Sequence, residues 1–202
     1  MKKKLQTNKQ HNIMKKVTFL LAALLVFGVA NIAKAAKPEG DKKSAAHGLN
    51  INIPTHAMIA LAGPSSTDID FEAEAAEVAG DKVTFAQTNE TALWLNYSSI
   101  VRSGKSNSIS AEISDVPDGL SIKVAVSSAA ASGKKGETGE GSTKELTTGG
   151  VEVVDGIGTC YTGSGENKGH SLVYTVSAKD ESYEDLVADN HNLTVTYTIT
   201  EN

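Results

Sequence analysis

The chain has 202 residues, with 19 basic and 24 acidic side chains, a net charge of −5 and a single cysteine. This charge balance argues against nucleic-acid binding through a basic surface, and one cysteine excludes an internal disulfide. Cys160 lies in "GIGTCYTG", which has no Lys, Arg or His beside it to activate a thiolate. Its role stays open between a small buried residue, an intermolecular link and a reactive thiol.

Residues 1–35 are expected to be a secretory signal peptide. Lysines come first, the apolar run 17–33 follows, and Ala33-Lys34-Ala35 forms a small-x-small cleavage site. Met14 would begin a signal of more usual length, so either Met1 or Met14 is the start. The alternative is an uncleaved membrane anchor, but the run is short for a span of ~20 residues. We therefore expect export to the periplasm, cell surface or medium, with no stable membrane span after cleavage.

Cleavage would make the remaining chain more acidic. It removes seven lysines and no acid, which leaves 12 basic and 24 acidic residues and a net charge of −12. A bulk charge of this sign does not attract nucleic acid or an anionic membrane.

Residues 36–48 are polar and small and predict a flexible linker, so that 49–202 form a single domain. Alternating apolar and polar residues with frequent turn residues predict an all-β, antiparallel, immunoglobulin-like β-sandwich. The expected strands fall within 49–61, 67–78, 81–88, 92–101, 106–116, 120–128, 151–158, 170–178 and 192–202. Residues 127–145, rich in Gly, Ser, Lys and Glu, predict a mobile loop, and 180–189 a helical turn or a corner crossing.

No motif in the sequence indicates a reaction. The glycines of 155–170 lack the Walker lysine and lead into a strand instead of a helix, so nucleotide binding is not supported. The acidic residues of 68–77 lack EF-hand spacing, and a solvated strand face explains them more simply than calcium does. We expect no catalytic residues, no metal and no cofactor, and therefore not an enzyme.

The only tryptophan lies in "ALWLNYSSIV". In an extended strand, Leu93, Leu95 and Tyr97 face the core and Trp94 faces the opposite side. Trp94 is either shielded by a loop or exposed to a ligand, such as a sugar ring, together with Tyr161 and the Gly-rich loop.

The two ends of the predicted domain carry the most informative pattern. Apolar residues keep one parity from Leu49, Ile51 and Ile53 to Leu61, over 13 residues, up to ~43 Å of extended chain and longer than a typical strand. Pro54, on the other parity, cannot donate a ladder hydrogen bond. Either residues 49–53 add to the sheet of a neighbouring molecule while 57–61 serve their own domain, or one long strand carries a bulge near Pro54.

The C-terminal residues alternate in the same way. In "LTVTYTI", Leu193, Val195, Tyr197 and Ile199 share one face of an expected edge strand. With the signal peptide and the N-terminal apolar segment, this layout resembles a chaperone–usher-type pilin subunit and is similar to spore-coat-U-like secreted proteins. The chain departs from many such subunits in having no cysteine pair, and polar Glu201 and Asn202 follow the C-terminal pattern.

The resemblance implies an incomplete sandwich that another copy completes with its N-terminal segment, and an export chaperone that covers the C-terminal edge in transit. Two functions are therefore expected as alternatives. The first is a secreted structural or adhesive surface subunit that self-assembles by donating Leu49, Ile51 and Ile53. The second is a stand-alone secreted binding module, for example for carbohydrate, with a complete monomeric sandwich.

Overall fold

The computed structural model describes residues 44–64, 67–88 and 92–202. The predicted signal peptide and residues 36–43 of the predicted linker lie outside the described residues. The boundary between two structural units falls between Ile51 and Asn52. No strand or helix is assigned to residues 44–55, and all elements discussed below belong to the second unit.

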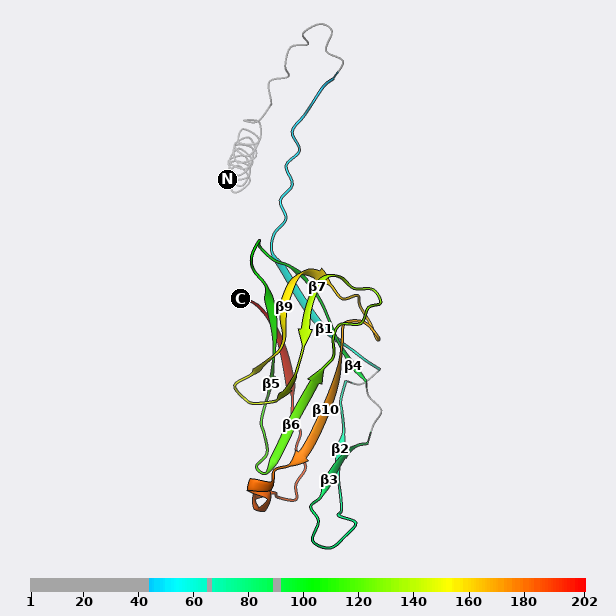
Figure 1. Cartoon of the computed structure of the whole chain (residues 1–202), viewed down its shortest axis with the longest axis vertical. Helices are drawn as coiled ribbons and strands as arrows, with labels where there is room; N and C mark the ends of the chain where they lie inside the picture. The colour runs from blue at the N-terminus through cyan, green and yellow to red at the C-terminus, as the bar shows by residue number, and fades with distance from the viewer. Residues whose placement is uncertain (1–43, 65–66, 89–91) are drawn as a thin grey trace, which may run out of the picture. The chain divides into compact units, whose positions relative to one another are not determined.

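The described part of the second unit contains eleven strands and one short 3₁₀ helix (Figure 1). The strands are β1 (His56–Ala62), β2 (Phe71–Glu74), β3 (Thr84–Gln87), β4 (Leu93–Ile100), β5 (Asn107–Ile113), β6 (Leu120–Val126), β7 (Lys135–Gly141), β8 (Thr143–Glu145), β9 (Val151–Tyr161), β10 (His170–Ala178) and β11 (Val195–Glu201). The 3₁₀ helix η1 (Asp180–Asp185) lies where a helical turn was expected.

The prediction of an all-β, antiparallel fold is confirmed. Nine strands form one sheet with the order β11-β5-β9-β4-β10-β6-β8, in which β1 also pairs with β4 and β7 with β9. One edge of β4 is covered by β1, whereas its other edge is shared by β10 near Leu93 and by β9 near Ser98. The 11-residue strand β9 thereby connects the part of the sheet around β4 to the part around β5.

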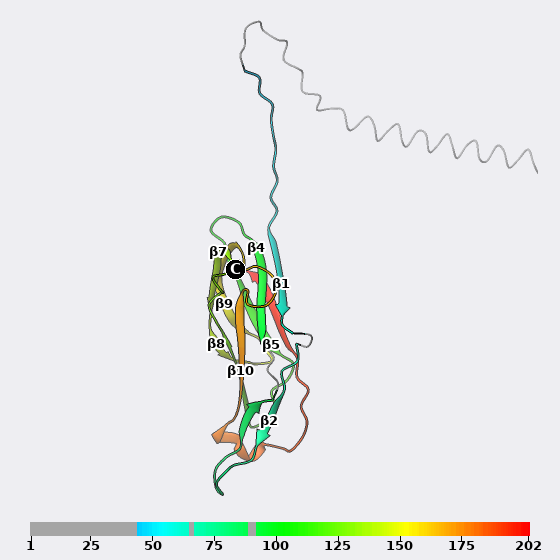
Figure 2. The same ribbon diagram turned by 90° about the vertical axis from the view of Figure 1, so that its right-hand side faces the viewer.

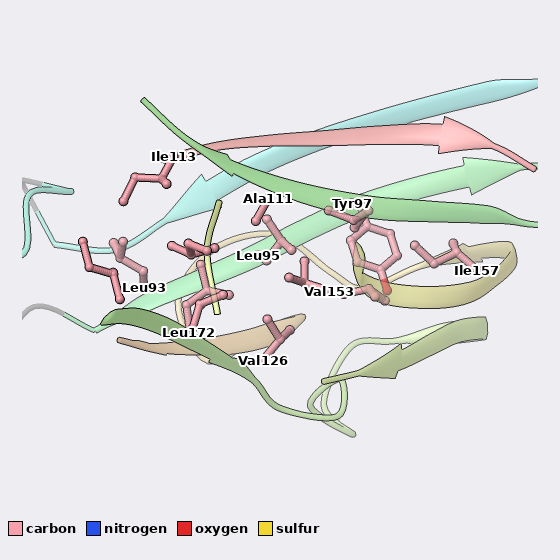
Figure 3. Packing of buried hydrophobic residues seen from close by; sticks show 14 of the residues in the cluster. Leu93, Leu95, Tyr97, Ala111, Ile113, Val126, Val153, Ile157 and Leu172 are labelled. Atoms are coloured by element: carbon pink, nitrogen blue, oxygen red, sulfur yellow. The ribbon is translucent and has the colours of Figure 1, made fainter. Parts of the chain in front are cut away.

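The core is built from the apolar residues of alternating strands. Leu93, Leu95 and Tyr97 of β4 are 4%, 0% and 5% exposed, so their predicted inward orientation is correct. Figure 3 shows these side chains turned toward residues of β5, β6, β9 and β10. Because period-two alternation places every second residue on one face, a single buried cluster collects side chains from β4, β5, β6, β9 and β10.

Two segments differ from the sequence-based expectation. Residues 127–145, predicted as a mobile loop, contain β7 and β8. Their glycines and charged residues give no apolar alternation, but β7 pairs with β9 along its length, and main-chain hydrogen bonds do not require apolar side chains. The acidic strand β2 is shorter than expected and pairs only with β3, in a separate two-stranded sheet.

Candidate functional site

The first and last strands of the described chain both lie at open edges of the nine-stranded sheet. The ladder of β1 is formed with β4 and that of β11 with β5, and no ladder joins β1 to β11 within the described residues. The two strands nevertheless lie side by side (Figure 2). Edge strands that present unpaired main-chain groups are templates for pairing with another chain.

The side chains of β11 alternate between the core and solvent. Val195, Tyr197 and Ile199 pack against the buried cluster but remain only half-buried. The residues between them, Thr196, Thr198 and Thr200, are exposed. The core is thus incompletely covered along this strand. Leu193, predicted as part of the strand, lies before its first residue and also packs half-buried against the core.

Strand β1 is similarly open along its length. Ile59 is half-buried against the core, whereas Leu61 and Met58 are 39% and 62% exposed. Ile59 of β1 thus packs against the same buried cluster as the odd-numbered residues of β11.

The main-chain groups of β11 can be assigned to its two sides. The carbonyl of Thr194 accepts the amide of Ser114 at 2.9 Å, and the amide of Asn202 donates to the carbonyl of Ser106 at 2.8 Å, both toward the segment that contains β5. Because successive residues of an antiparallel strand point to opposite neighbours, even-numbered residues face β5. The amides and carbonyls of odd-numbered residues, from Val195 to Glu201, consequently point to the open side.

A small cavity lies where β1 begins and β11 ends, and its volume is about 150 Å³. It is lined by Thr55, His56, Ala57, Ile100, Asn107 and Glu201. The carboxylate of Glu201 is held by the guanidinium of Arg102, with Nη1 and Oε1 3.0 Å apart. The open edge is thus apolar along β11 and polar at its C-terminal end.

The N-terminal candidates are exposed apolar side chains outside any strand. Leu49, Ile51 and Ile53 are 78%, 74% and 69% exposed, whereas strand β1 starts only at His56. An exposed alternating apolar segment is unusual, because such side chains are normally buried against their own fold.

The structure does not bring the two candidate ligand aromatics together. Trp94 is half-buried and lies opposite Ala62 and Ser171, while Tyr161 is 50% exposed and lies opposite Ser98. Four positions of β4 separate the two sites, on the order of 13 Å at the rise of a strand.

Asn96, on the same face as Trp94, has a role that the sequence did not indicate. Its Nδ2 donates to the carbonyl of Lys168 at 2.8 Å, and its Oδ1 accepts the amide of Gly165 at 2.7 Å. The Gly-rich loop is thereby fixed over β4, and Asn96 is only 6% exposed. The loop is therefore tied to the sheet at this point.

A buried polar group in the core was also missed. The imidazole of His170 is stacked on Tyr97, with ring centroids 5.5 Å apart, and Nε2 lies 2.6 Å from the Tyr97 hydroxyl. Its Nδ1 lies 2.6 Å from the carbonyl of Ser127, and a carbonyl only accepts, so Nδ1 carries a proton. The Tyr97 hydroxyl also contacts the carbonyl of Thr138. This group joins β4, β10, β7 and the segment after β6.

Burial shifts the pKa values of His170, Tyr97 and Cys160 toward their neutral forms. It lowers the pKa of His170 and raises the pKa of Tyr97 well above its ordinary range. Burial also raises the pKa of the Cys160 thiol to about 11, and the nearby Glu137 carboxylate acts in the same direction. A thiol with such a pKa is protonated at neutral pH and is a poor nucleophile.

Two general features of the described residues bear on the site. No group of three or more His, Cys, Asp or Glu side chains is placed to hold a metal ion in 44–64, 67–88 and 92–202. In the same ranges, no helix is long and apolar enough to cross a membrane.

Comparison with known proteins identifies no relative. No protein-family model matches the chain, and no curated protein or solved structure matches it either.

Proposed function

We propose that the protein is an exported structural or adhesive surface subunit that self-assembles when residues 49–53 of one copy add a strand to the open edge of the next. The domain is then an incomplete immunoglobulin-like sandwich, with β1-β4-β10-β6-β8 as one layer and β11-β5-β9-β7 as the other. An export chaperone would cover the same edge before assembly. The observation that carries the proposal is the half-buried row Val195, Tyr197 and Ile199 in a strand that forms a ladder on one side only within the described residues.

The energetics favour such an addition. Leu49, Ile51 and Ile53 are largely exposed, and burying three side chains of this size stabilises by on the order of 5 kcal/mol. The added strand would also satisfy the open amides and carbonyls of β11, because strand addition supplies main-chain hydrogen bonds while alternate side chains fill pockets. Both partners of the contact are present in one chain, so assembly needs no second protein.

The test is migration of the protein from its native host on SDS gels, with and without boiling. A ladder in the unboiled lane that collapses on boiling is expected. Replacing Leu49, Ile51 and Ile53 by Ser should abolish the ladder, because the donated side chains no longer bury apolar surface against Val195, Tyr197 and Ile199. The matched control replaces the intervening Asn50 and Asn52 by Ser and should retain the ladder. A single monomer band for the unaltered protein in both lanes contradicts self-assembly.

The alternative function, a monomeric binding module, has less support. Its two candidate aromatics lie apart, and the Gly-rich loop between them is tied to Asn96. Trp94→Ala separates the two functions. A binding module loses ligand with little loss of stability, whereas an assembly subunit keeps its ladder.

A further inference from the structure

We infer that the donated segment, whose existence rests on the proposed function, docks on β11 of a second copy in one register, antiparallel to that strand. Because the pairing is antiparallel, the numbers of the two residues in each pair add up to the same value throughout this register. The inward pairs are His47 with Glu201, Leu49 with Ile199, Ile51 with Tyr197 and Ile53 with Val195. The outward pairs are Gly48 with Thr200, Asn50 with Thr198 and Asn52 with Thr196.

The two sequences are complementary at every position of this pairing. Three apolar side chains of the donated segment meet the three half-buried side chains of β11. His47 alone meets a charged residue, Glu201, which lines the cavity together with His56 and forms an ion pair with Arg102. The outward pairs join small or polar residues to exposed threonines. A shift by one residue would turn Asn50 and Asn52 into the core.

Shifts by two residues are also less favourable. A shift in one direction places Leu49 on the Glu201 carboxylate. A shift in the other direction places His47 on Ile199 and extends the pairing beyond Val195, the first residue of β11. Only in the inferred register do the apolar contacts stop at Val195, where β11 begins. Pro54 then lies opposite Thr194, just outside the strand.

The main-chain groups fit the same register. The odd-numbered residues of β11 point their amides and carbonyls to the open side, as the contacts of Thr194 and Asn202 require. Their partners are His47, Leu49, Ile51 and Ile53, and each of these has an amide to donate. Pro54 has an even number, so its missing N–H faces away from β11 and removes no bond from this ladder.

The occupant is a second copy, because the chain cannot reach its own edge in this direction. Strands β1 and β11 run in opposite directions (Figure 3), so a strand antiparallel to β11 is parallel to β1. Parallel neighbours in one sheet require a crossover of about a dozen residues or more. Only Pro54 and Thr55 separate Ile53 from His56. A tight hairpin is also disfavoured, since the usual two-residue turns need a positive φ at the position of Pro54.

The register is tested by disulfide trapping in full-length protein that carries Cys160→Ala. Asn50→Cys is combined with Thr196→Cys, Thr198→Cys or Thr200→Cys, all at exposed positions of β11. Under mild oxidation, boiled non-reducing gels should show a covalent ladder for the Thr198→Cys combination and at least tenfold less for the other two. This preference is expected because only directly opposite Cα atoms lie within disulfide range, about 4.4–6.8 Å.

The outcomes separate the register from the proposed function. If the unboiled ladder forms but the disulfide forms preferentially with Thr196→Cys or Thr200→Cys, the register is wrong and self-assembly stands. The absence of any unboiled ladder from the unaltered protein overturns both.

A second variant tests the identity of the occupant. Inserting about 12 Gly and Ser residues between Ile53 and Pro54 makes a crossover long enough for the segment to reach its own β11. This variant should become a monomer, with the Asn50→Cys and Thr198→Cys disulfide formed within one chain. A two-residue insertion is the control and should remain polymeric. Polymers of unchanged length from the long insertion would contradict the direction inferred for the segment.

Discussion

The hydroxyl oxygens of Tyr174 and Tyr197 lie 2.7 Å apart, and this hydrogen bond joins β10 to the edge strand β11. Burial raises the pKa of both phenols above the ordinary range, so both are neutral at physiological pH. Either hydroxyl is able to donate. The contact ties the middle of the open edge to the opposite part of the sheet.

Removing one hydroxyl of this pair should destabilise the fold. Tyr174→Phe and Tyr197→Phe are each expected to lower the free energy of unfolding by about 1–2 kcal/mol, because the remaining hydroxyl loses its partner in a partly buried site. The double variant should lose less than the sum of the two, with a coupling of about 1 kcal/mol. Urea unfolding at pH 7 measures the cycle. Additive single effects would show that the contact contributes nothing.

Cys160 should make the protein sensitive to alkali. Burial raises the pKa of its thiol from an ordinary value of 9.0 to about 11 in the folded chain. Above pH 9 the unfolded chain releases this proton while the folded chain retains it, so stability falls as pH rises toward 11. The expected loss from this group by pH 11 is about 2 kcal/mol.

The Cys160 contribution is isolated by comparing the unaltered protein with Cys160→Ala. The difference between their free energies of unfolding should be constant from pH 7 to 8.5 and should shift in favour of Cys160→Ala between pH 9 and 11. The buried tyrosines also lower the free energy of unfolding at alkaline pH, but they are present in both proteins and cancel in the difference. A constant difference up to pH 11 would falsify the assignment to Cys160.

His170 should make the protein sensitive to acid. Burial lowers the pKa of its imidazole, so the unfolded chain binds a proton first as pH falls below about 6.5. The contribution of His170 to the free energy of unfolding is therefore fully present above that pH and is lost progressively below it. His170→Gln, which retains a donor for the Ser127 carbonyl, should be less stable at pH 8 but should lose less stability between pH 7 and 5.

Exposed His191 provides the control for this prediction. His191→Gln should follow the unaltered protein across the same pH range, as measured by urea midpoints. Equal acid sensitivity of His170→Gln and the unaltered protein would assign the effect to other groups.

Gly169 should not tolerate a side chain. Its φ is +65°, and an added Cβ would run into the carbonyl oxygen of Leu95. Gly169→Ala combines left-handed strain with overpacking, and a loss of roughly 3 kcal/mol or more is expected. Gly156 has a similar φ of +71° but open space around it, so Gly156→Ala should lose only about 1 kcal/mol. Thermal unfolding of both variants measures the difference, and equal losses would mean that the backbone at Leu95 adjusts.

Asn96 should control the Gly-rich loop. Asn96→Ala leaves the Gly165 amide and the Lys168 carbonyl without their side-chain partner, at an expected cost of about 1–3 kcal/mol. Hydrogen exchange of the Gly165 amide should accelerate at least tenfold. Ser98→Ala, on the same face of β4, is the control and should leave this exchange rate unchanged.

The sequence predicted those parts of the fold in which apolar alternation decides the structure. The inward row Leu93, Leu95 and Tyr97 is correct because each residue buries an apolar side chain on one face. The same reasoning located most strands of the large sheet. The arrangement of those strands in layers stays a prediction within the proposed function.

Features that depend on partners far away in the chain were not accessible in this way. Strand β7 was missed because its only buried residue is Thr138, and its pairing is supplied by β9. Asn96 lies on the face of β4 that carries Trp94, and its burial depends on a loop about 70 positions later. Likewise, His170 gains its partners only when β4, β7 and β10 meet.

The open edge also has a consequence for the order of events during synthesis. Its two borders are the first and the last strands of the described chain, and residues 49–53 precede both. If residues 49–53 are donated as proposed, a chain that emerges from the ribosome carries this segment long before β11 exists to receive one. In the proposed assembly, a nascent chain would be able to give a strand but not to accept one until β11 has paired with β5. Chain order by itself would restrict growth of an assembly to completed molecules.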